Sequence, residues 1–293
     1  MSVMRLTDYT EHVHSIKAKS TAEMYSSSVA KFLRHLGQNP FTVTSMPVNT
    51  LQKYISFLSQ TLKATSVNVH WAAIKHYLNW LKENGVIVAR TAKPELPRIG
   101  NPKRIFFDLE QLIYIIKFVD ENIADPAKTL LTILAGSGLR VSEVCSIKIG
   151  DISISESGRI MLSVVGKRQK QRNVPLLSFA KIALISYLRK QTQDNGPDDF
   201  LFPSDHADGH VNIKRVQKWT ERLSAKIGFH IHPHALRRTH FTLLNNQGVD
   251  PFTIKEIAGH SNLATTSLYV KVDAGKMDDS LKSLEAEYGR RKQ

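Results

Sequence analysis

Apolar residues recur every three to four positions through the first 87 residues, which is the spacing of amphipathic helices. The pattern covers a short segment that begins near residue 8, and then residues 19–37 and 49–62. In the fourth segment, residues 65–85, one face carries a row of apolar side chains: Val67, Trp71, Ile74, Leu78 and Leu81. Amphipathic helices with short connections predict a helical bundle as an N-terminal domain, residues 1–87.

The next stretch, residues 88–104, breaks this pattern. It contains three prolines and a Gly-Asn pair, which exclude a continuous helix and predict an extended linker. Five basic residues and one acidic residue lie in it, so the linker also suits a path along a phosphate backbone.

From residue 105 onward, helical and β patterns alternate. Asp108 followed by Gln111 is a helix-capping pair with apolar periodicity behind it. Residues 152–155, 159–165 and 171–176 alternate or are β-branched and are separated by short polar turns, which predicts a three-stranded antiparallel sheet. Helical patterns return after Ser178. The chain is therefore predicted to be mainly α with one small three-stranded antiparallel β-sheet (α+β), the sheet lying in a second domain, residues 105–293.

The most informative feature of the composition is the net charge. The 293 residues are 42% hydrophobic, which suits a globular chain with the length of about two domains. Forty Lys and Arg residues against 26 Asp and Glu residues give a formal charge of +14. This excess favours a polyanionic partner, most simply nucleic acid, over a membrane surface.

The cysteine and histidine patterns favour neither a disulfide nor a metal site. Cys145 is the only cysteine and lies in an apolar pattern, so we expect a buried structural thiol and a reducing compartment. His230, His232 and His234 alternate as zinc ligands on a strand would, but no CxxC or HExxH motif accompanies them and Pro233 suits a helix start better. No apolar run reaches the roughly 18 residues of a membrane span, and the first 13 residues lack a signal-peptide core. A cytoplasmic protein without membrane contact is predicted.

Two basic motifs are candidates for binding an anionic group. In HPHALRR, His234 and Arg237 would share one face at a helix N-terminus, where free backbone N–H groups also attract anions. In GSGLRVSE, the glycines allow a sharp turn that places Arg140 at the start of the next helix. A solvated basic turn and an incidental arginine are the alternatives.

Three further residues suit acid–base or nucleophilic chemistry. Lys167 lies in the turn between two predicted strands, from which it can reach a groove and protonate a leaving oxygen, although such turns are often lysine-rich for solubility alone. His260 directly follows a helix-ending glycine. Tyr269 has a polar flank, although a helical tyrosine usually belongs to a core.

The order of these motifs resembles the tyrosine recombinases, or phage integrase family, over essentially the whole chain. The segments that carry the resemblance are GSGLRVSE, GKRQKQRNVPL, HPHALRR and AGHSNLATTSLY. They place the catalytic residues of the family at Arg140, Lys167, His234, Arg237, His260 and Tyr269. The family often has glycine after the turn lysine, and Arg168 stands here instead, which leaves Lys167 and Lys170 as alternatives for the general acid. The compact length resembles Xer-type recombinases as well as transposon resolvases and integrases.

The resemblance implies site-specific cleavage and rejoining of double-stranded DNA without a metal or any other cofactor. Tyr269 would attack the scissile phosphate and form a 3′-phosphotyrosyl bond, which conserves the bond energy for religation. The other roles would be phosphate binding for Arg140, Arg237 and His260, protonation of the 5′ oxygen for Lys167, and handling of the tyrosine proton for His234.

The resemblance also implies an architecture. The helical core-binding domain and the catalytic domain would form a C-shaped clamp around DNA, and a tail from about residue 273 would dock on a neighbouring subunit of a homotetramer. The need for a partner recombinase or accessory DNA-bending proteins stays open, as does the choice between chromosome-dimer or cointegrate resolution and mobile-element integration or excision. Further candidate DNA contacts are Lys19, Asn68, Lys75, His76, Arg104 and Arg168.

Two other functions fit the same motifs. One is a DNA-binding protein that keeps the fold without catalysis, and the full set of catalytic residue types argues against it. The other is a type IB topoisomerase, which the predicted N-terminal bundle and docking tail argue against.

Overall fold

The computed structural model describes residues 6–37, 49–85, 92–100, 105–166, 171–191, 195–205 and 208–259. The chain divides into two compact units, Met1–Pro102 and Lys103–Gln293. This division falls inside the basic segment that was predicted to be a linker. No helix among the described residues has the length and apolar character that crossing a membrane requires.

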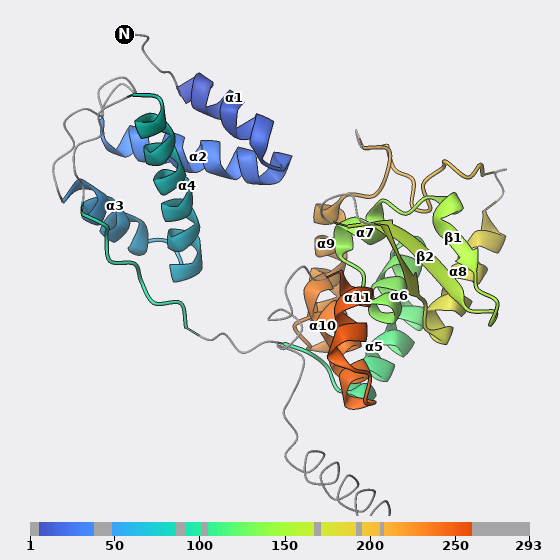
Figure 1. Ribbon diagram of the computed structural model, residues 1–293. Helices are drawn as coiled ribbons and strands as arrows, with labels where there is room; N and C mark the ends of the chain where they lie inside the picture. Colours follow the sequence, from blue (N-terminus) through green and yellow to red (C-terminus); the bar gives the residue numbers. More distant parts are fainter. Residues whose placement is uncertain are drawn as a thin grey trace, which may run out of the picture. The chain divides into compact units, whose positions relative to one another are not determined.

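The described part of the first unit is helical apart from residues 92–100. Its helices are α1 (Leu6–Ile16), α2 (Lys19–His35), α3 (Thr50–Ser59) and α4 (Ala64–Glu83) (Figure 1). Helix α2 packs against α1 and α4, and α3 packs against α4. The buried face of α4 is rotated from the predicted one, because Tyr77 and Trp80 are buried while Trp71 and Leu78 are half-buried. Tyr9 supplies the reason, since its ring packs edge-on against the rings of both Tyr77 and Trp80.

Residues 92–100 form neither a helix nor a strand, as their prolines predict for helix. Two side chains of the helical bundle hold this backbone. Asn68 Nδ2 donates to the Pro97 carbonyl at 3.2 Å, and the Glu95 N–H donates to Gln52 Oε1 at 2.8 Å. Leu96 packs against the apolar core of the bundle. This part of the basic segment is therefore fastened to the first unit.

The second unit begins with α5 (Leu109–Asn122), and its predicted capping pair is confirmed. Gln111 N–H donates to Asp108 Oδ1 at 2.8 Å, and Asp108 N–H donates to Gln111 Oε1 at 3.1 Å. The elements that follow, besides the strands, are α6 (Ala127–Ser137), α7 (Val141–Cys145), the 3-10 turn η2 (Ile149–Asp151), α8 (Ser178–Lys190), α9 (Ile213–Ile227), α10 (Pro233–Asn246) and α11 (Pro251–Ala258). Helix α6 is buried along its whole length and contacts α5, α7, α8 and α10, so it is the centre of this unit.

The predicted antiparallel sheet is confirmed. In the described chain, β1 (Ile152–Ile154), β2 (Ile160–Val165) and β3 (Gln171–Pro175) pair in the order β1-β2-β3. Leu162 lies opposite both Ile152 and Val174, and Leu162 and Val174 are fully buried. The structure is thus mainly helical with one small sheet, the fold class that the sequence predicts.

Cys145 ends α7 and is fully buried, as its apolar pattern predicts. Burial raises the pKa of its thiol to about 12, so the thiolate is scarce at neutral pH. The thiol therefore belongs to the core.

Candidate active site

The turn between α6 and α7 places the first predicted site residue. Gly138 ends α6 with a φ of +65°, in the left-handed region that favours glycine. Arg140 then occupies the N-cap position of α7, as predicted. Gly136 has another role than the predicted turn, because a Cβ there would lie 2.5 Å from the Ala180 Cβ; the glycine lets α6 and α8 pack closely.

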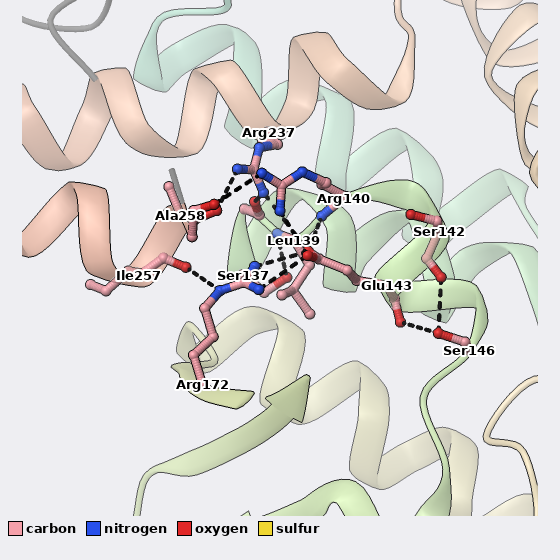
Figure 2. Close-up of polar contacts among 12 residues, drawn as sticks. Ser137, Leu139, Arg140, Ser142, Glu143, Ser146, Arg172, Arg237, Ile257 and Ala258 are labelled. Carbon is pink, nitrogen blue, oxygen red and sulfur yellow. Dashed lines mark hydrogen bonds and ion pairs between the residues drawn. The ribbon is translucent and has the colours of Figure 1, made fainter. Parts of the chain in front are cut away.

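Glu143 on α7 joins arginines from separate elements (Figure 2). Its Oε1 accepts from Arg140 Nη1 at 2.8 Å and from Arg172 Nη1 at 3.0 Å. Its Oε2 accepts from the Arg140 N–H at 2.8 Å and from Arg172 Nη2 at 2.9 Å, and it lies 4.0 Å from Arg237 Nη1. Burial by itself would raise the pKa of Glu143, but the hydrogen bonds from Arg172 and Arg140 outweigh it and the pKa is lowered. The carboxylate is therefore ionised at neutral pH.

The same arginines bind the C-terminal end of α11. The contacts go to consecutive carbonyl groups: Arg172 Nε to Ile257 at 2.9 Å, Arg237 Nη2 to Ala258 at 2.7 Å and Arg140 Nη2 to Gly259 at 3.2 Å. The last carbonyls of a helix lack intrahelical partners and form the negative end of its dipole. Their positive partners therefore stabilise the helix end that directly precedes His260 in the sequence.

The two predicted arginines lie together but are not equally accessible. The side chain of Arg140 is 37% exposed, whereas that of Arg237 is 3% exposed. Arg237 Nη1 donates to the Gly138 carbonyl at 2.6 Å, and its Cζ lies 5.1 Å from the ring centre of Phe241. Arg140 therefore faces solvent, with Arg237 buried behind it.

His234 lies in the first turn of α10 and is exposed. Shielding of its ring by the surrounding protein, and then the positive charges of Arg238 and Arg237, lower its pKa; Arg140 contributes in the same direction. The imidazole is therefore neutral at neutral pH, and the sequence-predicted His234, Arg237 and Arg140 share one electrostatic environment.

His232 caps the helix that carries His234 and Arg237. Its Nδ1 accepts the N–H of Ala235 at 3.1 Å, so this nitrogen is unprotonated in the folded chain. Among the described residues, no group of three or more His, Cys, Asp or Glu side chains is arranged to hold a metal ion.

Removal of this cap is expected to destabilise the second unit. His232→Ala should lower the free energy of unfolding by about 1 kcal/mol, and His232→Asn, which can accept the same N–H, should lose less. Denaturant unfolding at neutral pH measures both. Equal stability of the alanine variant and the wild type would show that the contact contributes nothing.

His240 on α10 is expected to make the stability of this unit fall in acid. Its Nδ1 pairs with the Ala135 carbonyl at 3.2 Å, and burial lowers its pKa from 6.5 to about 4. Between these values the unfolded chain binds a proton that the folded chain does not, so unfolding becomes easier as the pH falls. Through His240 alone, the free energy of unfolding should fall by about 2 kcal/mol between pH 7 and pH 5. His240→Gln should show a smaller loss in denaturant titrations at the two pH values, and an unchanged loss would contradict this assignment.

The candidate DNA contacts of the first unit differ in exposure. Lys19 and Lys75 are exposed. Asn68 is half-buried, and its Nδ2 donates to the carbonyls of Ala64 and Pro97. His76 is half-buried, and its Nδ1 lies 3.1 Å from the Tyr9 hydroxyl. Asn68 and His76 therefore make contacts within their own unit, and a DNA contact by either stays a prediction.

Several predicted residues lie outside the described residues. These are Lys167, Lys170, His260 and Tyr269 of the catalytic set, Arg104 and Arg168 of the candidate DNA contacts, and the tail from about residue 273.

The sequence did not single out Glu143 or Arg172. The available signal was the position of Glu143, three residues after Arg140, where an acidic side chain can bond the N-cap backbone. Arg172 gave no such signal, because its partners lie 29 and 85 residues away in the sequence.

Two family models and several curated proteins match this chain. The family model described as "Phage integrase family" matches residues 106–276, and "Phage integrase, N-terminal SAM-like domain" matches residues 6–85. A tyrosine recombinase of Pseudothermotoga lettingae is 31% identical over 295 residues, covering 97% of this chain and 98% of that protein. The tyrosine recombinase XerA of Pyrococcus horikoshii is 29% identical over 269 residues, covering 90% of this chain and 87% of that protein.

A solved structure shows the same fold. The XerH site-specific recombinase bound to a palindromic difH substrate, in a post-cleavage complex, matches with a TM-score of 0.73 and 18% identity. The match covers 96% of this chain and 85% of that chain.

The family match and these relatives define an enzyme class that cleaves and rejoins DNA. The chain belongs to the phage integrase family, whose relatives named here are tyrosine recombinases. The predicted family and site-specific recombination are confirmed, and these relatives favour neither the silent DNA-binding protein nor the topoisomerase.

Proposed function

We propose that this chain recombines specific DNA sites by cleaving and rejoining duplex DNA through Tyr269. The observation that carries this assignment of residues is the meeting of Arg140 and Arg237 at one buried carboxylate, with His234 in the same environment. Positive groups fixed in position before the substrate arrives can stabilise the charge that develops on a phosphate during the reaction.

The nucleophile needs activation. A tyrosine hydroxyl has a pKa near 10, so only about one in 1,000 is ionised at neutral pH. His234 is neutral there and accepts the proton as the Tyr269 oxygen attacks phosphorus. Arg140, which is partly exposed, binds a non-bridging oxygen of the phosphate. The positive charge of the buried Arg237 stabilises the same phosphate.

The leaving 5′ oxygen must receive a proton, which comes from a different side chain than the one that accepts the tyrosine proton. As the tyrosine oxygen bonds to phosphorus, the bond from phosphorus to the 5′ oxygen breaks, and Lys167, or Lys170 in its place, protonates that oxygen. His260 donates to a phosphate oxygen. The 3′-phosphotyrosyl bond keeps the energy of the broken bond, so attack by a 5′ hydroxyl of another strand rejoins DNA without a cofactor.

DNA is held by both parts of the chain in this proposal. Residues 1–87 and residues 105–293 both contact the duplex, and the net charge of +14 supports contact with phosphates. Lys19 and Lys75 are exposed candidates for such contacts. The tail from about residue 273 docks on a neighbouring copy, which gives a homotetramer on two sites, alone or with a partner recombinase or DNA-bending proteins. The enzyme works in the cytoplasm, on the nucleoid when bound to DNA.

Recovery of the target site tests this function. The protein is incubated with nicked duplex fragments of genomic DNA from the organism that encodes it, and complexes that survive SDS are sequenced. A nick beside the cleavage site lets a short strand escape, so the covalent adduct accumulates. A plasmid that carries two copies of the recovered site should then yield recombinant circles.

Three results would contradict the proposal. Relaxation of a supercoiled plasmid without the site, and no recombinant circles, would indicate a topoisomerase. Salt-sensitive DNA binding without any adduct, also when a host-cell extract supplies possible partner proteins, would indicate a silent DNA-binding protein. An SDS-stable adduct whose DNA is joined to a residue other than a tyrosine would exclude the phosphotyrosyl route.

A further inference from the structure

Arg172 on β3 contacts the arginine site but is shielded from solvent, whereas Arg140 is partly exposed. Its side chain is 13% exposed, against 37% for Arg140. Each of its side-chain nitrogens donates a hydrogen bond: Nη1 and Nη2 to the two oxygens of Glu143, and Nε to the Ile257 carbonyl. This paired, planar geometry is one that a guanidinium supplies and an ammonium does not.

The contact with α11 is close enough to restrict the sequence beside it. Gly259 has a φ of +62°, and a Cβ there would lie 3.0 Å from Arg172 Cζ. The guanidinium therefore packs against the backbone at the point where α11 ends. Any shift of Arg172 would be transmitted to Gly259, whose carbonyl accepts from Arg140 and whose successor in the chain is His260.

Charge gives Arg172 a second effect. Glu143 is a buried anion, and Arg140 is the partly exposed cation bound to it. Arg172 supplies a hydrogen bond to each carboxylate oxygen, so it shares the negative charge that otherwise falls on Arg140. A less strongly held Arg140 is more available to an incoming phosphate, because carboxylate and phosphate compete for the same guanidinium.

We propose that Arg172 is a positioning residue for DNA cleavage: it holds Glu143 and the end of α11 so that Arg140 and the chain leading into His260 meet the scissile phosphate. This inference rests on the proposed function, and it adds a residue outside the six assigned to catalysis. Arg172 acts through Glu143 and Gly259 and does not itself bind DNA.

Single-turnover cleavage of the recovered nicked site tests the role of Arg172. At saturating DNA, Arg172→Met should form the covalent adduct about 10- to 100-fold more slowly than the wild type, which is the scale expected when catalytic groups are misplaced. DNA affinity should stay within about twofold, since the residue makes no phosphate contact. Arg172→Lys keeps the charge but not the paired hydrogen bonds, so its rate should lie between those of Arg172→Met and the wild type. The matched control is Arg159→Met, which removes an exposed arginine next to the same sheet and should cleave like the wild type.

The pH profile separates positioning from a merely structural role. Among the described residues, the charged groups that face Glu143 are Arg140 from the turn before α7, Arg172 from β3 and Arg237 from α10. Hydrogen bonding by Arg172 helps to lower the pKa of Glu143, so its loss raises that pKa. Cleavage by Arg172→Met or Arg172→Lys should therefore be lost at a higher pH than in the wild type as the solution is acidified.

Each other outcome counts against the inference. A wild-type rate in Arg172→Met refutes it while the adduct of the wild type upholds the proposed function. Weaker DNA binding with a normal rate at saturation makes Arg172 a DNA contact instead. If Arg172→Met does not fold, Arg172→Lys decides: a lower rate with an unchanged acid limb shows a structural role only. Absence of an adduct in the wild type refutes both the proposed function and this inference.

Discussion

Arg140→Ala is expected to lower the rate of DNA cleavage by about 10²- to 10³-fold, the cost of removing one group that stabilises transition-state charge. Arg140 is the partly exposed guanidinium of the site, and Arg237 is too deeply buried to replace it. The fold should survive, because Arg172 still pairs with both oxygens of Glu143. Single-turnover adduct formation on the recovered site gives the rate.

Two further variants test whether the loss of rate is specific to the guanidinium of Arg140. Arg140→Lys keeps the charge and loses the two-pronged geometry, so it should recover only part of the rate. Arg159→Ala removes an exposed arginine of the same unit and should leave the rate unchanged. Equal rates for Arg140→Ala and the wild type at saturating DNA would remove Arg140 from the catalytic set.

Tyr269→Phe is expected to abolish the covalent adduct while DNA binding persists. The chain has eight tyrosines, and burial makes several of them poor nucleophiles. It raises the pKa of Tyr54 and of Tyr77 to about 12, and that of Tyr9 higher still. A phenylalanine keeps the ring and lacks the attacking oxygen, so no residual rate through this position is possible.

Tyr114→Phe is the matched control for the nucleophile. Tyr114 lies on α5 of the same unit, is 50% exposed and has no assigned role. This variant should form the adduct at the wild-type rate. An adduct that persists in Tyr269→Phe and disappears in another tyrosine variant would move the nucleophile.

Local patterns predicted the parts of this fold that depend on neighbouring residues. The capping pair of Asp108 and Gln111, the antiparallel strands and the placement of Arg140 after a left-handed glycine all follow from short-range chemistry. Periodicity also predicted the helical bundle, but not the rotation of α4 toward Tyr77 and Trp80. That rotation depends on the ring of Tyr9, more than 60 residues away in the sequence.

The site itself was predictable only in part, for the same reason. Spacing placed His234 and Arg237 on one helix, yet their burial differs because α6 and α11 cover Arg237 through the Gly138 and Ala258 carbonyls. The ion pair of Glu143 and Arg172 joins helix α7 to strand β3. No spacing rule predicts such a contact, because tertiary packing creates it.

Mass spectrometry of the covalent adduct identifies the residue that attacks DNA. Wild-type protein trapped on the nicked site is digested with trypsin and nuclease, and the peptide that retains a nucleotide phosphate is identified. Cleavage after Lys255 and Lys271 gives a peptide, residues 256–271, in which Tyr269 is the only tyrosine. We expect a phosphotyrosyl nucleotide on this peptide, at Tyr269. A nucleotide on any other residue, or none on the protein that cleaved the DNA, would contradict it.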